Sequence, residues 1–200
     1  MSVISLSLAC TAITGCGGGD ASNPSVQAPA AIRLAAQPIP LQSGMSYGTS
    51  FWAEGSSATG GSGTPVADVN CLVNEDYHIH THLTILRDGR VLAIPGHIGL
   101  KGCAYELHTH DLSGVIHVET ASYRKFTLGQ FFAVWGQPLG RDNVAHLTGQ
   151  PVVVYLNDGT GLTEYTGDLQ SLELKGHREI TIVVGSAPAE IPSYTWPDSL

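Results

Sequence analysis

The residues of this chain that are best suited to chemistry are its histidines, which are concentrated in one stretch. Seven of the nine histidines lie between residues 78 and 117. A neutral imidazole nitrogen is a good ligand for Cu(II), Zn, Ni and Fe ions. The patterns His78-x-His80-x-His82 and His108-x-His110 repeat with a period of two. Because alternate residues of a β-strand project from one face, each pattern presents its imidazoles together if the segment is a strand.

A turn between two of these segments predicts which histidines meet across a sheet. Read as a four-residue loop, Asp111–Gly114 sets His108 opposite His117. The Cβ atoms of directly paired residues are roughly 4.5–5.5 Å apart, which lets two imidazoles reach one ion. The predicted metal ligands are His78, His80, His82, His108, His110, His117 and Glu119.

A structural or pH-responsive histidine cluster is the alternative to a metal site. Five or six imidazoles on coincident faces would repel one another once protonated and would add little to a core, so metal binding is the favoured hypothesis. Copper and zinc are the first choices, because Met1 and Met45 are the only methionines and form no Cu(I) motif. His97 lies on a predicted loop and fits either interpretation, whereas His146 and His177 are predicted to be surface residues.

Two cysteines precede the histidine patterns at similar distances. Cys71 lies seven residues before His78, and Cys103 lies five residues before His108. Cysteines in an oxidising compartment most often pair, and neither of these has the Cys-x-x-Cys spacing typical of thiolate metal sites. Closing a loop of about 33 residues would stabilise the fold by about 3–4 kcal/mol on the chain-entropy model. We therefore predict a disulfide between Cys71 and Cys103.

The charge balance excludes two classes of partner. The chain has 17 acidic and 9 basic residues, a net charge of -8, and no cluster of Lys and Arg. Binding to nucleic acid or to an anionic lipid surface requires such clusters, so neither is expected. No apolar run reaches the roughly 18 residues of a membrane span. Any membrane attachment is therefore expected through a lipid anchor only.

The N-terminus resembles the signal of a bacterial lipoprotein. An apolar stretch over 3–13 ends in Ile-Thr-Gly-Cys at residues 13–16, which is similar to a lipobox. Cys10, in Ser-Leu-Ala-Cys, is a second candidate. The resemblance implies that residues 1–15 are a signal peptide, that Cys16 is lipidated, and that the protein is exported as a periplasmic or outer-surface lipoprotein.

Composition divides the remainder of the chain into three parts. Residues 16–65 are rich in Gly, Ser, Ala and Pro and are predicted to be a flexible linker, interrupted by Phe51 and Trp52. Residues 66–190 are predicted to form a histidine-rich β domain, and 191–200 a tail.

Periodicity places strands and one helix within this domain. A period of two predicts strands over 78–85 and 91–95, joined by an Asp-Gly turn, and over 104–110 and 115–120. Further strands are predicted over 152–156 and 180–184. Thr127 and Gln130 form a capping box before a short apolar helix, which Gly136 ends. The predicted fold is α+β and mostly β: one small domain of antiparallel hairpins with a short buried helix, β-grasp-like, with a β-sandwich as the alternative.

Two stretches resemble known groups of proteins. Residues 107–119 (LHTHDLSGVIHVE) and 126–132 (FTLGQFF) resemble a group of uncharacterised, histidine-rich secreted proteins of bacteria and archaea, over about residues 75–190. That resemblance implies export and no particular activity. Residues 102–110 are similar to the G-x5-H-x-H opening of cupins, but Glu119 comes nine residues after the second histidine instead of three or four.

Three functions are consistent with the sequence. The leading hypothesis is an exported, membrane-tethered protein that binds copper or zinc as a carrier, buffer or sensor. The first alternative is a mononuclear metalloenzyme, with cupin-like chemistry or metal-assisted hydrolysis, in which Glu119 or Glu106 acts as general base or fourth ligand. The second is an envelope interaction module without metal. No sequence motif assigns a catalytic residue or a protein partner.

Overall fold

The computed structural model describes residues 31–57 and 60–200 of the chain. The predicted signal peptide over 1–15, the predicted lipidation site Cys16 and the start of the predicted linker lie outside the described residues. Among the residues that are described, no helix is long and apolar enough to cross a membrane.

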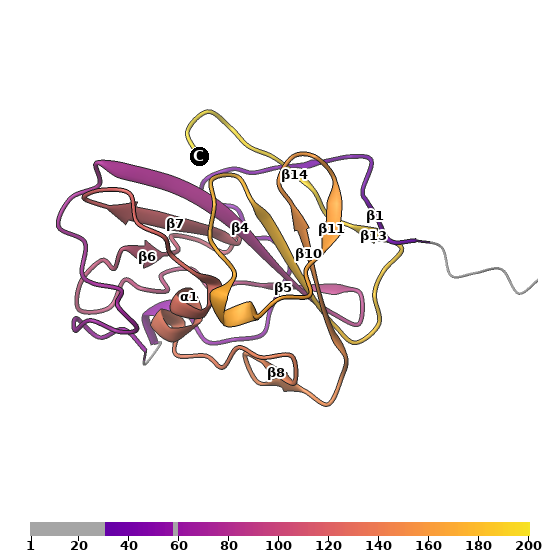
Figure 1. Ribbon diagram of the computed structural model, residues 1–200, viewed down its shortest axis with the longest axis horizontal. Helices are drawn as coiled ribbons and strands as arrows, with labels where there is room; N and C mark the ends of the chain where they lie inside the picture. The colour runs from indigo at the N-terminus through magenta and orange to yellow at the C-terminus, as the bar shows by residue number, and fades with distance from the viewer. Residues whose placement is uncertain (1–30, 58–59) are drawn as a thin grey trace, which may run out of the picture. The chain divides into compact units, whose positions relative to one another are not determined.

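One mixed sheet of eight strands forms the centre of the fold (Figure 1). Its strands are β3 (Thr49–Ser50), β4 (Tyr77–Arg87), β5 (Arg90–Ala93), β6 (Leu107–His108), β7 (Val115–Thr120), β10 (Val152–Asn157), β11 (Leu162–Glu164) and β12 (Glu179–Val184). The longest, β4, has different neighbours along its length. Its first half pairs antiparallel with β7, and its second half pairs parallel with β12 and antiparallel with β5.

The first predicted hairpin, between β4 and β5, is confirmed. Arg87 pairs with Arg90, leaving a two-residue turn. Asp88 and Gly89 in that turn have positive φ angles of 49° and 76°. A type I′ turn requires positive φ at both positions, and Asp-Gly adopts it readily.

The second predicted hairpin is confirmed in its register. His108 pairs with His117, and Leu107 pairs with Val118, as the four-residue turn implies. The same strand β7 then pairs on its other edge with β4, where His117 lies opposite His80. Strand β7 therefore lies between the two histidine-bearing segments.

The strand predicted over 104–110 is much shorter than expected. Only Leu107–His108 belongs to the ladder. The next residue, Thr109, pairs elsewhere: its N–H donates to the carbonyl of Ile98, and its own carbonyl accepts from the N–H of His97. The preceding loop at His97 and Ile98 thus takes the backbone hydrogen bonds that a longer hairpin would have used.

Helix α1 (Leu128–Trp135) begins and ends where the sequence predicts. The hydroxyl of Thr127 accepts from the N–H of Gln130, and the side-chain carbonyl of Gln130 accepts from the N–H of Thr127. Gly136 ends the helix in the left-handed conformation, with φ at 71°. The apolar side chains of the helix pack in the main core against β4 residues such as Leu83.

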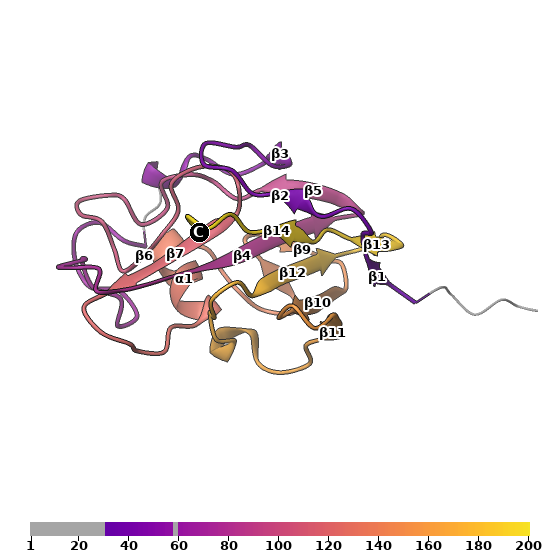
Figure 2. The same cartoon turned by 90° about the horizontal axis from the view of Figure 1, so that it is seen from above.

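The two faces of the sheet have different covers. Helix α1 packs on one face, and segments from the two ends of the described chain lie over the other (Figures 1 and 2). Those segments carry the parallel pairs β1 (Arg33–Leu34) with β13 (Glu190–Ile191), and β2 (Ile39–Pro40) with β14 (Tyr194–Thr195). The remaining elements are the pair β8 (Asn143–Val144) and β9 (Leu147–Thr148) and the 3-10 helices η1 (Gly55–Ser57) and η2 (Leu169–Ser171).

This arrangement confirms the predicted α+β, mostly β fold. Strands predominate, and one helix backs a single central sheet. Strand β12 lies between β10 and β4 and runs parallel to β4. A helix-backed mixed sheet fits the β-grasp-like prediction better than the β-sandwich alternative, which requires two packed sheets.

Within the described part of the chain, the structure corrects the prediction of a flexible linker, at residues 31–57 and 60–65, and that of a tail at 191–200. From Ala31 onwards the described chain belongs to the same compact unit as the sheet. Trp52 packs edge-to-face on Trp135, with ring centroids 5.1 Å apart, and its indole N–H donates to the carbonyl of Ala145. Strands of two residues have no detectable periodicity, which is why the sequence pattern did not reveal them.

The predicted disulfide between Cys71 and Cys103 is confirmed. An isolated bridge pairs Cys71 with Tyr105, so the disulfide ties the segment before β4 to the segment before β6. Both segments lead directly to histidine-bearing strands. The bond therefore constrains where those strands begin.

Removing the disulfide should lower the free energy of unfolding by about 3–4 kcal/mol, because it closes a loop between residues 32 apart. The test is urea denaturation of the Cys71→Ser, Cys103→Ser double variant beside the unreduced parent. The single variant Cys71→Ser should lose about as much as the double variant, since either change breaks the bond. A double variant as stable as the parent would contradict a stabilising role.

Candidate metal centre

The candidate metal centre lies on the sheet face opposite α1. On β4, Leu83 points into the core beneath the helix, so residues of the other parity, such as His80, point to the opposite face. On β7, Val118 belongs to that core, and His117 and Glu119 project away from it. The period-two pattern of the sequence thus becomes two faces, one apolar and one rich in histidine.

Four predicted ligands form the tightest group. The ligand atoms of His108, His110, His117 and Glu119 all lie within 4.8 Å of one another. The Nε2 atoms of His108 and His110 are 3.2 Å apart, and Glu119 Oε1 lies 3.6 Å from His108 Nε2. His108 and Glu119 are buried, His117 is half-buried and His110 is exposed. The group is therefore a partly enclosed site that is open on the His110 side.

A second group shares one member with the first. His78, His80 and His117 also have ligand atoms within 4.8 Å of one another. His117 Nδ1 lies 3.1 Å from His80 Nε2 and 3.4 Å from His78 Nε2. A third group joins His78 and Glu119 to Glu75, which the sequence analysis did not single out because it lies outside the period-two pattern.

These separations match those expected of ligands around one ion. Donor atoms that lie about 2.0–2.1 Å from a metal at tetrahedral angles are roughly 3.3–3.4 Å apart. The distances from Glu119 Oε1 to His117 Nδ1 and to His78 Nε2 are 3.3 and 3.0 Å. Small adjustments of side-chain torsions would centre an ion among these atoms.

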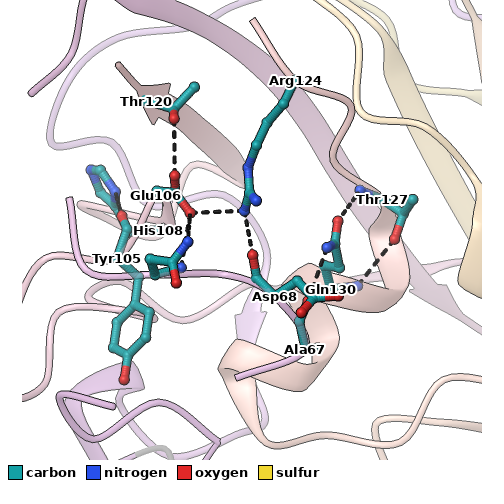
Figure 3. A network of polar contacts seen from close by, with 10 residues as sticks. Ala67, Asp68, Tyr105, Glu106, His108, Thr120, Arg124, Thr127 and Gln130 are labelled. Carbon is teal, nitrogen blue, oxygen red and sulfur yellow. Dashed lines mark hydrogen bonds and ion pairs between the residues drawn. The ribbon is translucent and has the colours of Figure 1, made fainter. Parts of the chain in front are cut away.

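A backbone contact with Tyr105 sets the orientation of the His108 ring (Figure 3). Its Nδ1 lies 2.8 Å from the carbonyl oxygen of Tyr105. A carbonyl only accepts, so Nδ1 carries the proton and Nε2 presents its lone pair to His110 and Glu119. Such a contact is typical of metal-binding histidines, because it sets both the tautomer and the ring orientation.

Burial keeps the central imidazoles uncharged. It lowers the pKa of His80 and of His108 to about 4, and that of His117 to about 2, with the neighbouring histidines adding to the effect. Burial also raises the pKa of Glu119 above its usual value, against the opposing influence of His78. Since only the neutral imidazole binds a metal, the histidines are ready to act as ligands at neutral pH.

The structure separates His82 from the predicted ligand set. The side chain is fully buried, and its Nε2–H donates to the carbonyl of Ser113 at 2.8 Å. Its ring packs on Tyr194 of β14, with centroids 3.7 Å apart. None of the ligand groups among the described residues includes His82. His82 lies on the same face of the sheet as His80, but the C-terminal segment that contains Tyr194 covers that part of the face.

Glu106, which the sequence analysis offered as an alternative general base or fourth ligand, binds other residues instead (Figure 3). Its carboxylate accepts from Arg124 at 2.8 Å, from the hydroxyl of Thr120 at 2.9 Å and from the N–H of Asn70 at 2.8 Å. With these donors Glu106 holds the start of β6 in place, and it belongs to none of the ligand groups among the described residues. It is a structural residue here.

The other three histidines lie outside the centre. His97 pairs with Glu54, at 2.6 Å, and His146 is exposed near Trp52 and Trp135. His177 is exposed as predicted, but it also lines a hollow together with His78 and His80. That proximity could not be read from the sequence, since 97 residues separate His80 from His177.

Three hollows in the described part of the chain adjoin the centre, and the smallest, of about 70 Å³, is lined by His110 and His117. A cavity of about 310 Å³ lies on the His110 side, and its apolar walls include Trp52, Pro95 and Leu112. A second hollow of about 300 Å³ lies beside His78 and His80. His110 on one side, and His78 and His80 on the other, therefore line hollows that open to solvent.

Comparisons of the chain with protein-family models, with curated proteins and with solved structures found no match. The chemistry of this site must therefore follow from its own geometry. That geometry defines a cluster of histidine and glutamate side chains that could hold a metal ion.

The metal-free protein should lose stability as the pH falls from about 7 to about 4. In the unfolded chain histidine titrates near 6.5, whereas His80 and His108 titrate at about 4 in the fold. Between these values the unfolded state binds more protons, so each histidine lowers the free energy of unfolding by up to about 1.4 kcal/mol per pH unit. The raised pKa of Glu119 has the opposite effect on the free energy of unfolding, but it concerns a single carboxyl against several histidines.

Urea denaturation at pH 7, 6, 5 and 4, in the presence of a chelator, measures this dependence. His146→Asn is the matched control, because His146 is exposed and asparagine tolerates its positive φ of 70°. The control should follow the same pH dependence as the parent. A free energy of unfolding that stays constant from pH 7 to pH 5 would contradict the burial of neutral imidazoles.

Proposed function

We propose that this protein binds a divalent copper or zinc ion at the cell envelope, as a carrier, buffer or sensor of the metal. The observation that carries the proposal is the group of His108, His110, His117 and Glu119, whose ligand atoms lie within 4.8 Å of one another. Three imidazoles and one carboxylate supply enough donor atoms for a four-coordinate ion.

Burial and accessibility support the same proposal. Holding several imidazoles in a partly buried space costs free energy unless their lone pairs gain a partner, and a metal ion is such a partner. The exposed His110 leaves a path for the ion to enter and leave. A carrier or buffer needs such a path, whereas a purely structural site is usually closed.

The choice of copper or zinc rests on the donor atoms. Cys71 and Cys103 are joined to each other and offer no thiolate. Imidazole with carboxylate suits Cu(II) and Zn, and both ions occur in these coordination sets. The disulfide is compatible with an oxidising compartment, where Cu(II) also persists.

A mononuclear metalloenzyme is a second candidate, and one observation favours it. The cavity of about 310 Å³ next to His110 is large enough for a small organic molecule. With Trp52 and Leu112 in its wall, it would take an apolar or aromatic group and present it to an ion bound at His110. Glu119 would then serve as ligand or general base, in cupin-like chemistry or in hydrolysis. If no metal binds, an envelope interaction module is the remaining hypothesis.

Export and lipidation belong to the same proposal. The lipobox-like Ile-Thr-Gly-Cys at residues 13–16 and the resemblance of residues 75–190 to secreted histidine-rich proteins support them. Cys16→Ser should move the protein from the membrane to the soluble fraction and abolish labelling with a fatty acid. Cys10→Ser is the matched control and should leave both unchanged. Equal membrane binding and labelling of the Cys16→Ser variant would refute lipidation at this residue.

The metal proposal is tested by elemental analysis of protein purified from exported material without chelator, followed by titration with Zn²⁺ and Cu²⁺ at pH 7. Replacing His108 and His117 together by Ala should weaken binding by more than about 100-fold, since two direct ligands are lost and removal of their supporting contacts alone costs 10–100-fold. His146→Asn should bind like the parent. Affinity in the parent should fall as the pH drops toward about 4, where protons compete with the metal for His80 and His108. A parent that holds no metal at neutral pH would refute the proposal.

A further inference from the structure

The cluster contains more ligands than one ion uses. Five histidines and Glu119 take part in the groups described above, and Glu75 adds a second carboxylate. A protein-bound zinc ion takes four ligands, and a catalytic one takes three with an open position. The surplus therefore requires a separate explanation.

The ligands are arranged as two pairs about a shared centre. His78 and His80 come from β4, whereas His108 and His110 come from β6 and the residues after it. Each pair belongs to one ligand group, and the two groups have only His117 in common. The ring of His117 is 4.4 Å from His80 at an interplanar angle of 89°, and it is stacked on His108 at 5.2 Å and 11°.

Glu119 reaches both pairs. Its Oε1 lies 3.0 Å from His78 Nε2 on one side and 3.6 Å from His108 Nε2 on the other. A carboxylate has two oxygens and about four lone-pair directions, so it can bind two ions at once. Glu119 is itself buried, with 5% of its surface exposed.

We infer that the cluster is a dinuclear centre in which Glu119 bridges two divalent transition-metal ions. With both ions bound, one is held by His108, His110 and Glu119, and the other by His78, His80 and His117, the member common to both groups. Glu119 reaches this other ion beside His78 and His117, at 3.0 and 3.3 Å from their ring nitrogens. The inference rests on the proposed function, since it presupposes that the cluster binds metal. Carboxylate-bridged ions in proteins lie about 3.5–4 Å apart, a spacing suited to ligands this close together.

The two ions have different coordination. His117 Nδ1 is within 3.1–3.4 Å of both β4 histidines, so that ion has three imidazole ligands in addition to the bridging carboxylate. The ion at His108 and His110 has three, and its open position is on the side of the 310 Å³ cavity that His110 lines. The ion at His108 and His110 is therefore the one that exchanges with solvent or contacts a bound molecule.

The first test is the stoichiometry of the full chain, measured with Zn²⁺ by equilibrium dialysis and elemental analysis at pH 7. The parent and the His146→Asn control should bind two ions. His78→Ala with His80→Ala, and separately His108→Ala with His110→Ala, should each bind one. If either double variant does not fold, the corresponding His→Gln changes replace it, and the parent value alone remains decisive.

The second test uses Cu²⁺ and electron paramagnetic resonance. The first equivalent added to the parent should give a signal of full intensity, and the second should reduce the intensity per ion, because two Cu(II) ions bridged by one carboxylate couple magnetically. Each double variant should give the full signal of a single ion.

The outcomes separate this inference from the proposed function. One ion in the parent, retained by one double variant and lost by the other, would overturn the dinuclear centre and leave a mononuclear metal site. Two ions with undiminished signals would overturn the bridge by Glu119. No ion in the parent would overturn the proposed function itself.

Discussion

The antiparallel ladder between β4 and β7 is the constraint on which the rest of the structure depends. It runs through six residue pairs, from Tyr77 with Thr120 to His82 with Val115. A slip of one residue would exchange the two faces, and Ile116 and Val118 would then leave the apolar core. The burial of these side chains therefore enforces the register. Because His80 lies opposite His117 in that same register, the hydrophobic core indirectly sets the distances within the polar cluster.

The cluster itself carries a cost that the rest of the fold offsets. Imidazoles that are removed from water and crowded together stabilise nothing unless they gain hydrogen bonds or a metal. The disulfide, the hydrogen bonds of Glu106 and the buried helix α1 all act on the strands that bear the ligands. Site and support are thus divided between the two faces: packing on the helix side holds the ligands on the other.

The predictable features were those with local signals. The Asp88-Gly89 turn, the capping box at Thr127 and the pairing of His108 with His117 follow from rules that span a few residues, and the structure agrees with each. The features that could not be predicted depend on contacts distant in sequence. His82 has the same parity as His80, yet Tyr194, 112 residues later, covers it. Likewise, no short-range pattern indicates that residues 31–57 pack on the sheet.

The parallel pairing of β1 with β13, near the two ends of the described unit, has a mechanical consequence. Force applied to the chain ahead of residue 31 enters the described unit at β1, whose two residues pair with β13 and whose Arg33 forms an exposed ion pair with Glu190. This contact should break first under tension, because an exposed ion pair and a ladder of two residue pairs resist little force. The strands that bear the histidines lie beyond it in the load path and are anchored by the covalent link at Cys71. Under tension, the β1–β13 pairing can therefore separate while the geometry of the metal centre is preserved.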